Sequence, residues 1–197
     1  MSASLNNPIA GVILAGGKST RMGTHKALMH YCGARLIDYI AGTLKGANLP
    51  VYVSGDVAPF HCIPDLIADL GPLGGMISSV DFLRTQGIQA AVFVPVDMPY
   101  MNSQLLSRLI HCWNKQDAIH YPNYPLPLFL NFSPGVIDVL NNIKKNHTCD
   151  RSIRGLINQL YCYICNHSDD AEKKMFANVN TPEDWKQIQD IKFNDEY

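Results

Sequence analysis

The sequence predicts an α/β domain with a mostly parallel central sheet, and three observations support this fold class. Strand-like and helix-like patterns alternate along the chain. Two strand-like runs, Ile9–Leu14 and Ala90–Val94, are continuously apolar, as expected for strands that are covered on both faces. The 197 residues are 47% hydrophobic and 17% charged, which is enough apolar material for one sizeable core. We therefore expect one domain that spans residues 1–197.

The individual elements follow from the spacing of apolar residues and from capping signals. We expect strands over about residues 10–15, 51–53, 66–68, 90–94 and 118–121, with helices over about 36–44, 73–84 and 102–115 between them. A loop containing Pro122, Pro125 and Pro127 should precede a helix that starts at Ser133-Pro134 and ends near residue 144. A polar loop over 146–150, a short helix over 152–160, an alternating strand over 161–165 and a helix opened by Thr181 complete the order.

Composition excludes several classes of function. The net charge is 16 − 17 = −1 with the seven His counted as neutral, so the chain lacks the basic surface that non-specific nucleic-acid binding requires. No apolar run approaches the length of a membrane span. The polar, uncharged stretch Met1–Pro8 has no basic region or cleavage site of a secretion signal. We expect a cytoplasmic monomer with no nucleic-acid or membrane partner.

The cysteines are expected to be free thiols in such a compartment. Cys162 and Cys165 have the spacing of a redox or zinc pair, but no second pair stands at zinc spacing. In an alternating strand, two residues that are three positions apart point to opposite faces. We therefore expect no metal or redox role for Cys162 together with Cys165.

The most informative segment follows the first strand, where Leu14-Ala15-Gly16-Gly17 leads to Arg21 and Lys26. Glycines let a ligand approach the backbone, successive N–H groups form an anion-binding concavity, and the two cations add fixed positive charge. A P-loop would need Gly-Lys-Ser/Thr starting five positions after Gly17, where Met22 stands instead. A dinucleotide fingerprint would need spaced glycines that open a helix. Residues 14–28 therefore predict a phosphate-binding loop of another kind.

Asp97 stands just past the carboxyl end of the apolar strand over residues 90–94. A carboxylate at that place needs solvent, a cation or a metal, and ligands of open α/β sheets bind at this edge. One interpretation is a turn aspartate before Pro99. Beside a phosphate loop, we favour a Mg²⁺ ligand, because Mg²⁺ takes one or two carboxylates together with substrate phosphates.

Two further segments carry candidate binding residues. Asp69 follows a predicted strand and precedes Gly71-Pro72-Leu73, where glycine permits a nucleotide to approach closely; a turn and helix start is the alternative. Asn178 and Asn180 share one face if their segment is extended; a turn and cap before the helix at Thr181 is the alternative there.

Together these segments resemble the molybdenum cofactor guanylyltransferases, a family of nucleotidyltransferases that act on molybdopterin. The resemblance rests on Leu14–Leu28, Asp69–Met76, Pro95–Tyr100 and Asn178–Asp184, which keep the family's order and approximate spacing. The first segment is shared with cytidylyl and sugar-nucleotide transferases. The last is more specific to the guanylyl branch.

The resemblance implies a three-layer α/β/α Rossmann-like nucleotidyltransferase domain that transfers GMP from GTP to molybdopterin and releases pyrophosphate. It implies that Arg21 holds the departing pyrophosphate, Lys26 sits near the α-phosphate, and Asp97 binds Mg²⁺. Contacts to GTP are implied for Leu14, Ala15, Gly16, Gly17, Lys26, Ser54, Asp69, Gly71, Pro72, Leu73 and Asp97. Asn178, Asn180 and the C-terminal part of the chain would lie on the molybdopterin side, and cofactor-delivery or acceptor proteins would make transient contact.

The sequence departs from the family at three positions. His25 stands where relatives usually have Asp, Gly74 where Ala is more usual, and Ser54 where relatives often have an Asn that contacts the base. Guanine selection is therefore assigned to backbone groups of the first loop or to Asp69.

Three other functions are alternatives to guanylyl transfer. Molybdopterin cytidylyltransferases typically show Ala-Ala-Gly where this chain has Ala15-Gly16-Gly17. Sugar-nucleotide synthesis usually comes with a longer chain. A non-catalytic nucleotide-binding module would be favoured if Lys26 or Asp97 were missing, and both are present.

Overall fold

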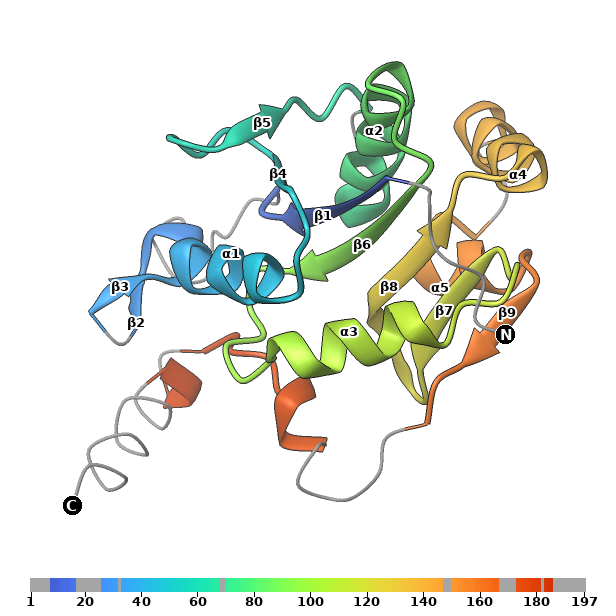
Figure 1. The fold of residues 1–197 in the computed structure, drawn as a ribbon. Coiled ribbons are helices and arrows are strands. Elements are labelled where there is room, and N and C mark those ends of the chain that lie inside the picture. The colour runs from blue at the N-terminus through green and yellow to red at the C-terminus, as the bar shows by residue number, and fades with distance from the viewer. Residues whose placement is uncertain are drawn as a thin grey trace.

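The computed structural model describes residues 8–16, 26–31, 33–67, 70–146, 150–166, 173–181 and 183–185. Gly17, Arg21, His25 and Asp69 therefore lie outside the described residues. The described chain is organised around a seven-stranded sheet with the strand order β5-β4-β1-β6-β8-β7-β9 (Figure 1). The strands of this sheet are β1 (Ile9–Leu14), β4 (Val51–Ser54), β5 (His61–Ile63), β6 (Ala90–Pro95), β7 (Ala118–Tyr121), β8 (Tyr124–Asn131) and β9 (Cys162–Ile164).

The sheet is mostly parallel, as the sequence predicts. β1 pairs in parallel with both β4 and β6, β4 with β5, and β7 with β9. Within this sheet, the pairings of β8 with β6 and β7 are the antiparallel ones among the described strands. The carboxyl ends of all the strands except β8 therefore lie at one edge of the sheet.

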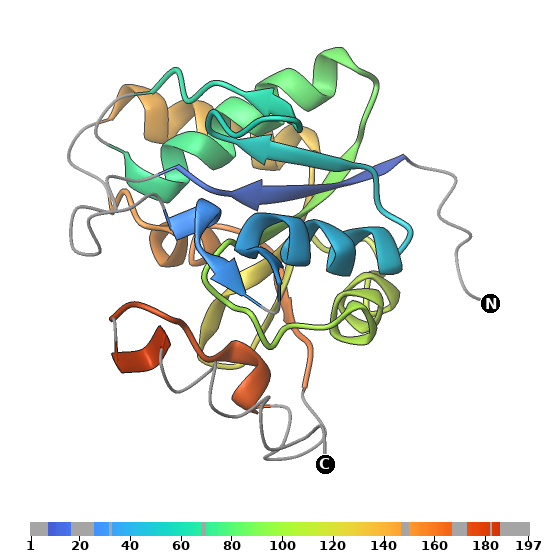
Figure 2. The same cartoon turned by 90° about the vertical axis from the view of Figure 1, so that its left-hand side faces the viewer.

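Helices cover both faces of the sheet (Figures 1 and 2). The helices are α1 (Leu36–Gly46), α2 (Gly71–Thr85), α3 (Ser103–His111), α4 (Pro134–Lys145) and α5 (Ile153–Ile157), with short 3-10 turns η1 (Lys26–Leu28) and η2 (Lys174–Phe176). A small hairpin of β2 (His30–Tyr31) and β3 (Ala34–Arg35) lies outside the main sheet.

The core is divided into two layers by the alternation of strand side chains. Ile13 packs with buried residues of α1 and α3, whereas its neighbour Val12 packs with buried residues of α2, α4 and α5. Successive strand residues point to opposite faces, so each strand contributes to both layers. This arrangement confirms the three-layer α/β/α class.

The prediction for residues 66–68 is wrong in its described part. The strand is β5, which ends at Ile63, and Leu66 and Ile67 lie in the connection that follows it. Leu66 is 80% exposed, so the apolar side chain that suggested a buried strand is in fact on the surface. Ala68 lies outside the described residues.

The predicted proline-rich loop is wrong for Pro125 and Pro127, which belong to β8, whereas Pro122 lies in the turn between β7 and β8. Proline is tolerated in a strand at bulges and edges, where its missing N–H is not needed. The ladder between β7 and β8 shifts register between His120 and Tyr121, next to these prolines.

Two predicted helices end earlier than expected. α3 stops at His111, and Lys115 has a positive φ of 69°, which a helix does not allow. The carbonyl and side-chain oxygens of Gln116 accept from Trp113 Nε1 and Asn114 N, so this segment forms a turn. α5 covers only Ile153–Ile157.

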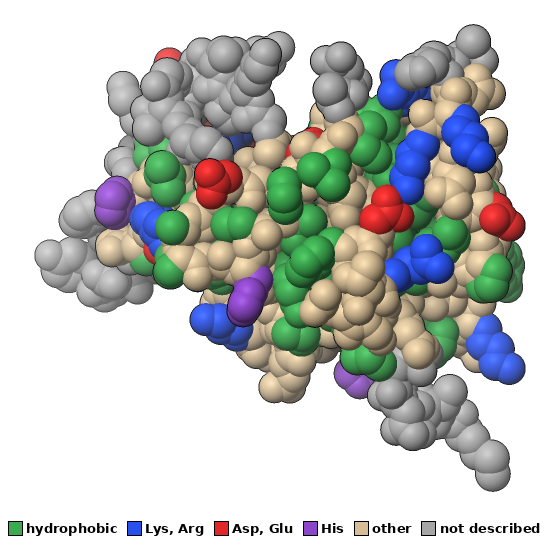
Figure 3. All heavy atoms as spheres, turned by 90° about the horizontal axis from the view of Figure 1, so that it is seen from above, with side chains coloured by type: hydrophobic (Ala, Val, Ile, Leu, Met, Phe, Trp, Pro, Cys, Tyr) green, Lys and Arg blue, Asp and Glu red, His purple; other side chains and the backbone are tan. Residues whose placement is uncertain are grey.

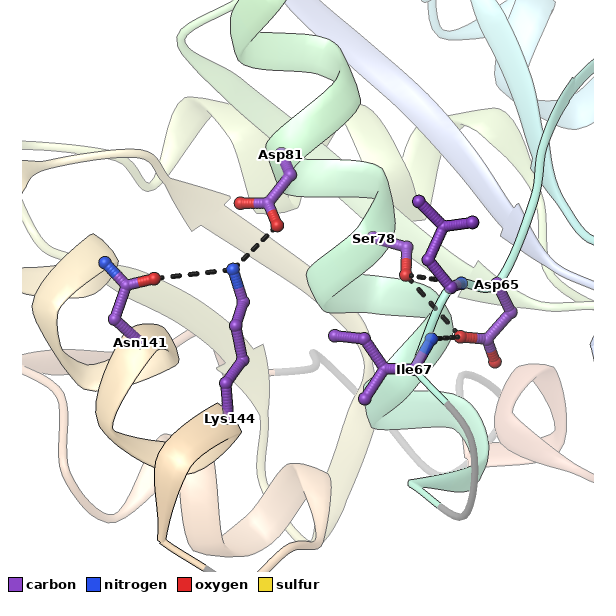
Figure 4. A network of polar contacts seen from close by, with 7 residues as sticks. Asp65, Ile67, Ser78, Asp81, Asn141 and Lys144 are labelled. Carbon is purple, nitrogen blue, oxygen red and sulfur yellow. Dashed lines mark hydrogen bonds and ion pairs between the residues drawn. The ribbon is translucent and has the colours of Figure 1, made fainter.

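α2 and α4 lie side by side on one face and are joined by an ion pair. Lys144 Nζ lies 2.6 Å from Asp81 Oδ2 and also donates to Asn141 Oδ1 (Figure 4). On the surface seen in Figure 3, cationic and acidic side chains are interspersed with hydrophobic ones. Among the described helices, none has the length and apolar character of a membrane span.

Candidate active site at the carboxyl edge of the sheet

The register of the sheet brings three strand ends together. Leu14 at the end of β1 pairs with Ser54 at the end of β4 and with Pro95 at the end of β6. In Figure 2, β1 points toward the side where η1, the first turn of α2 and the red C-terminal residues lie. This is the edge at which open α/β sheets bind ligands.

Lys26, Asp97 and Asn180 converge at this edge. The ammonium nitrogen Nζ of Lys26 lies 3.2 Å from Asp97 Oδ2 and donates a hydrogen bond to Asn180 Oδ1 at 2.8 Å. The partners are 71 and 154 positions away from Lys26 in the sequence. The side chains of Lys26 and Asp97 are only 13% and 23% exposed, so their charges attract each other with limited screening by water.

The segment that carries Asn180 is fixed through its backbone. Val179 donates its N–H to the carbonyl oxygen of Asp97 at 2.9 Å. Asp184 Oδ2 accepts from the N–H groups of Asn180 and Thr181, both at 2.9 Å, and Thr181 Oγ1 accepts from Asp184 N at 3.1 Å. These hydrogen bonds, first that from Asn180, hold the pKa of the Asp184 carboxyl below its usual value. The reciprocal pair is a capping box that opens the helical turn at 183–185.

Asn178 and Asn180 share an exposed face, since Val179 between them is buried. This is the alternation expected from their spacing. Asn180 reaches Lys26, whereas no hydrogen bond of the Asn178 side chain is seen among the described residues.

The first loop begins on tightly packed backbone. Gly55 has φ +128°, and an added Cβ there would lie 3.4 Å from Gly16 N and 3.5 Å from the carbonyl carbon of Ala15. The positive φ favours glycine at Gly55, which keeps the backbones after β1 and β4 close together. Ala15 N also donates to Ser54 O at 3.1 Å.

The start of α2 lies beside these strand ends and also depends on glycine. An added Cβ at Gly74 would lie 2.7 Å from the carbonyl oxygen of Ile67, and one at Gly75 would meet Ser54 Oγ. Gly71 has φ +51° and nothing near its Cβ position, so it is open to solvent. A helix N-terminus carries free N–H groups and partial positive charge, which suit an anionic ligand.

Some of the residues predicted to contact GTP are exposed to solvent, and others are buried. Gly16, Gly71 and Pro72 are exposed. Leu14, Ala15, Ser54 and Leu73 are buried, at 7%, 6%, 1% and 1% exposure. The Ser54 side chain packs against α2 and is not presented to a ligand, so what this strand end offers is backbone at Gly55. Gly17, Arg21 and Asp69 lie outside the described residues.

The residues present fit a hard cation. Among the described residues, no three His, Cys, Asp or Glu side chains are grouped to hold a metal, but Mg²⁺ needs only one or two carboxylates when substrate phosphates complete its shell. Asp97 Oδ2 and Asn180 Oδ1 both lie within 3.2 Å of one ammonium nitrogen. A carboxylate oxygen and an amide oxygen thus already converge on a positive charge.

Sequence reasoning did not identify three contributors to this edge. Gly55 follows β4 in a Ser-Gly-Asp triplet, a turn signal that was available. Asp184 was visible as the last residue of Thr181-x-x-Asp. Asp65 lies on the connection between β5 and α2, where its Oδ1 accepts from Ile67 N at 3.1 Å and from Ser78 Oγ at 3.5 Å (Figure 4). No pattern in the sequence singled out Asp65.

Comparison with known proteins gives consistent results. The family model described as MobA-like NTP transferase domain matches residues 11–162. The molybdenum cofactor guanylyltransferase of Xanthomonas euvesicatoria is 33% identical over 186 residues, covering 94% of this chain and 96% of the relative. A probable molybdenum cofactor guanylyltransferase of Methanocaldococcus jannaschii is 31% identical over 199 residues, covering 89% and 96%.

Solved structures share the fold. Molybdopterin-guanine dinucleotide biosynthesis protein A from Archaeoglobus fulgidus superposes with a TM-score of 0.73 at 20% identity, covering 94% of this chain and 99% of that chain. A nucleotidyl transferase from Methanothermobacter gives a TM-score of 0.70 at 16% identity, covering 97% and 100%.

Proposed function

The chain belongs to the MobA-like NTP transferase family, and we propose that it is a molybdenum cofactor guanylyltransferase, which transfers GMP from GTP to molybdopterin and releases pyrophosphate. The observation that carries the proposal is the convergence of Lys26, Asp97 and Asn180 at the carboxyl edge of the sheet. These three residues come from separate segments of the chain and meet where a nucleotide would bind. A non-catalytic module has no need for a charged cluster held this closely.

In the proposed reaction, a terminal phosphate oxygen of molybdopterin attacks the α-phosphorus of GTP, a P–O bond forms, and the bond to pyrophosphate breaks. A phosphate monoester is already largely ionised at neutral pH, because its second pKa is about 6. A strong protein base is therefore not required. Positioning and charge stabilisation supply most of the acceleration in phosphoryl transfer of this kind.

Lys26 is the residue that we assign to the α-phosphate. Two oxygens, Asp97 Oδ2 and Asn180 Oδ1, accept from its ammonium group and fix the position of this group before substrate binds. Within the described part of the chain, the third N–H of the ammonium group is left for a phosphate oxygen. A charge that is already oriented stabilises the transition state without further reorganisation. Arg21, in the predicted loop, is assigned to the departing pyrophosphate.

Asp97 is proposed to hold Mg²⁺ through its carboxylate, with Asn178 and Asn180 facing the molybdopterin side. When bound there, Mg²⁺ would supply positive charge that stabilises the nucleotide phosphates and the leaving group. The hydrogen bond from Val179 N to Asp97 O holds the segment that carries Asn178 and Asn180 beside Asp97, which supports this assignment.

Guanine selection is proposed to depend on the connection between β5 and α2. A carboxylate accepts hydrogen bonds from the guanine N1–H and amino group at the same time. Asp65 is exposed, and its Oδ1 is fixed by Ile67 N and Ser78 Oγ. Asp65 is therefore a second candidate beside Asp69, four positions further along the same connection.

Nucleotide binding tests the assignment directly. Titration calorimetry with GTP, CTP and ATP should show GTP binding most tightly, and tighter binding of CTP would exclude the guanylyl assignment. Asp65→Asn and Asp69→Asn should then be compared with Asp81→Asn, a control on the outer face of α2. Loss of the preference for GTP in one of the first two variants identifies the base-selecting carboxylate.

We further propose that the protein acts as a cytoplasmic monomer that passes its product to delivery or acceptor proteins by transient contact. The near-neutral charge of the chain, −1, favours no strong electrostatic partner. Sedimentation of the purified protein at several concentrations tests the monomeric state.

A further inference from the structure

Two cysteine thiols lie together on the α1/α3 side of the sheet and are not among the residues assigned to the site above. Cys112 follows the last residue of α3, and Cys165 follows the last residue of β9. Their sulfur atoms are 2.9 Å apart, although the residues are 53 positions apart in the sequence. Forming a disulfide of about 2.05 Å requires the sulfurs to approach by less than about 1 Å.

The backbone on both sides of the pair is anchored. Cys112 N donates to Arg108 O at 3.0 Å, and Cys165 N donates to His120 O at 2.9 Å. Both residues stand just beyond a regular element, so a small shift of either side chain need not break a helix or a ladder. The pair is therefore close enough to join without unfolding any described element.

The two thiols differ in access. Cys112 is half-buried, whereas Cys165 is 1% exposed. Burial, together with the hydrogen bond to Cys112, raises the pKa of the Cys165 thiol. An oxidant from solvent therefore reaches Cys112 first, and Cys165 is placed behind it as the resolving thiol.

We propose that Cys112 and Cys165 form an oxidation site, in which a hydroperoxide converts the two thiols to an intramolecular disulfide that fastens the end of β9 to the end of α3. The Cys112 thiolate attacks a peroxide oxygen, the O–O bond breaks, and hydroxide leaves to give a sulfenic acid. The Cys165 sulfur then attacks the Cys112 sulfur, the S–O bond breaks, and water leaves with the Cys165 proton. Two thiols are oxidised and one peroxide is reduced.

The disulfide closes a long loop that contains β7, β8, α4, α5 and β9. Closing such a loop lowers the entropy of the unfolded chain and stabilises the fold. For a chain of this size, we expect the melting temperature of the oxidised protein to rise by about 5–10 °C. The spacing of Cys162 and Cys165 pointed to a different pair, but Cys162 packs in the opposite layer of the core.

The test uses the full chain and hydrogen peroxide as the probe. After treatment, free thiols are alkylated, and the protein is digested without reductant and analysed by mass spectrometry. We expect one linked peptide pair that joins Cys112 to Cys165 and separates on addition of dithiothreitol. The wild-type protein and Cys162→Ala should both show this pair and the higher melting temperature. Cys112→Ser and Cys165→Ala should show neither.

Three results would overturn the proposal. First, both Cys112 and Cys165 could still be alkylated after peroxide treatment. Second, Cys112 could be oxidised to sulfinic acid with no linked peptide formed. Third, peroxide treatment could raise the melting temperature of Cys112→Ser as it does that of the wild type. Cys112 is partly exposed, so its replacement by serine leaves a folded protein in which absence of the link is informative.

Discussion

Replacing Asp97 by Asn separates a catalytic role from a structural one. At 3.2 Å and an effective dielectric constant of about 20, the gross attraction between Asp97 and Lys26 is about 5 kcal/mol. Desolvation and lost side-chain entropy offset much of this attraction, since exposed pairs contribute below about 1 kcal/mol and breaking a fully buried pair costs about 3–5 kcal/mol. With side chains that are 13% and 23% exposed, we expect a loss of about 2 kcal/mol of stability.

This loss should lower the melting temperature of Asp97→Asn by about 4–8 °C while unfolding stays cooperative. Transfer should fall by about 10²–10³-fold, because an amide keeps one acceptor oxygen but cannot neutralise a divalent cation. Pyrophosphate release per folded molecule, measured over a range of Mg²⁺ concentrations, reports the loss of transfer. A thermal melt of the same variant reports the loss of stability. Asp81→Asn is the matched control, since it breaks the ion pair with Lys144 on the outer surface and should leave transfer unchanged.

Retention of transfer within about twofold in a destabilised Asp97→Asn would exclude a catalytic role for this carboxylate. Asp97 would then be a turn residue that pairs with Lys26 only to hold the loop.

Substitutions at Gly74, Asp184 and Asn180 test other contacts at this edge of the sheet. Gly74→Ala should lower the melting temperature by about 2–8 °C, because its Cβ would lie 2.7 Å from Ile67 O, whereas Gly42→Ala on an open face of α1 should be neutral or stabilising in the same melts. Because the pKa of Asp184 is lowered in the folded protein, its charged form stabilises the fold above its ordinary pKa of 3.8, and this contribution is lost as the pH falls through the folded-state pKa. The melting temperatures of Asp184→Asn and wild type should therefore differ at neutral pH and converge in acid. Asn180→Ala removes the amide oxygen that accepts from the loop ammonium and should reduce transfer by about 10-fold or more with a small change in stability; equal turnover would remove this residue from the site.

The layered α/β/α architecture could be predicted from the sequence. The continuous apolar runs of β1 and β6 identified central strands, and capping signals located α4 at Ser133-Pro134 correctly. The sequence was insufficient where tertiary pairing overrides local preference. β8 contains two prolines, which local rules assign to a loop, yet its later residues pair with β6 and fill both core layers.

The candidate site shows the same division. Lys26, Asp97 and Asn180 were recognisable as site candidates from their motifs. The sequence did not show that the Lys26 ammonium group contacts both other side chains, because these contacts join residues that are 71 and 154 positions apart. The closeness of Cys112 and Cys165 was equally invisible, because neither local spacing nor periodicity relates the end of a helix to the end of an edge strand.

The proposed joining of GMP to molybdopterin at this carboxyl edge is tested most directly by pyrophosphate release. The protein is incubated with Mg²⁺, molybdopterin and GTP, CTP or ATP in turn, and the mass of the product is measured. We expect release with GTP, a product carrying one GMP per molybdopterin, and loss of both in Lys26→Ala and Arg21→Ala. Equal or faster release with CTP, or near-normal release with GTP in both variants, would contradict the proposed function.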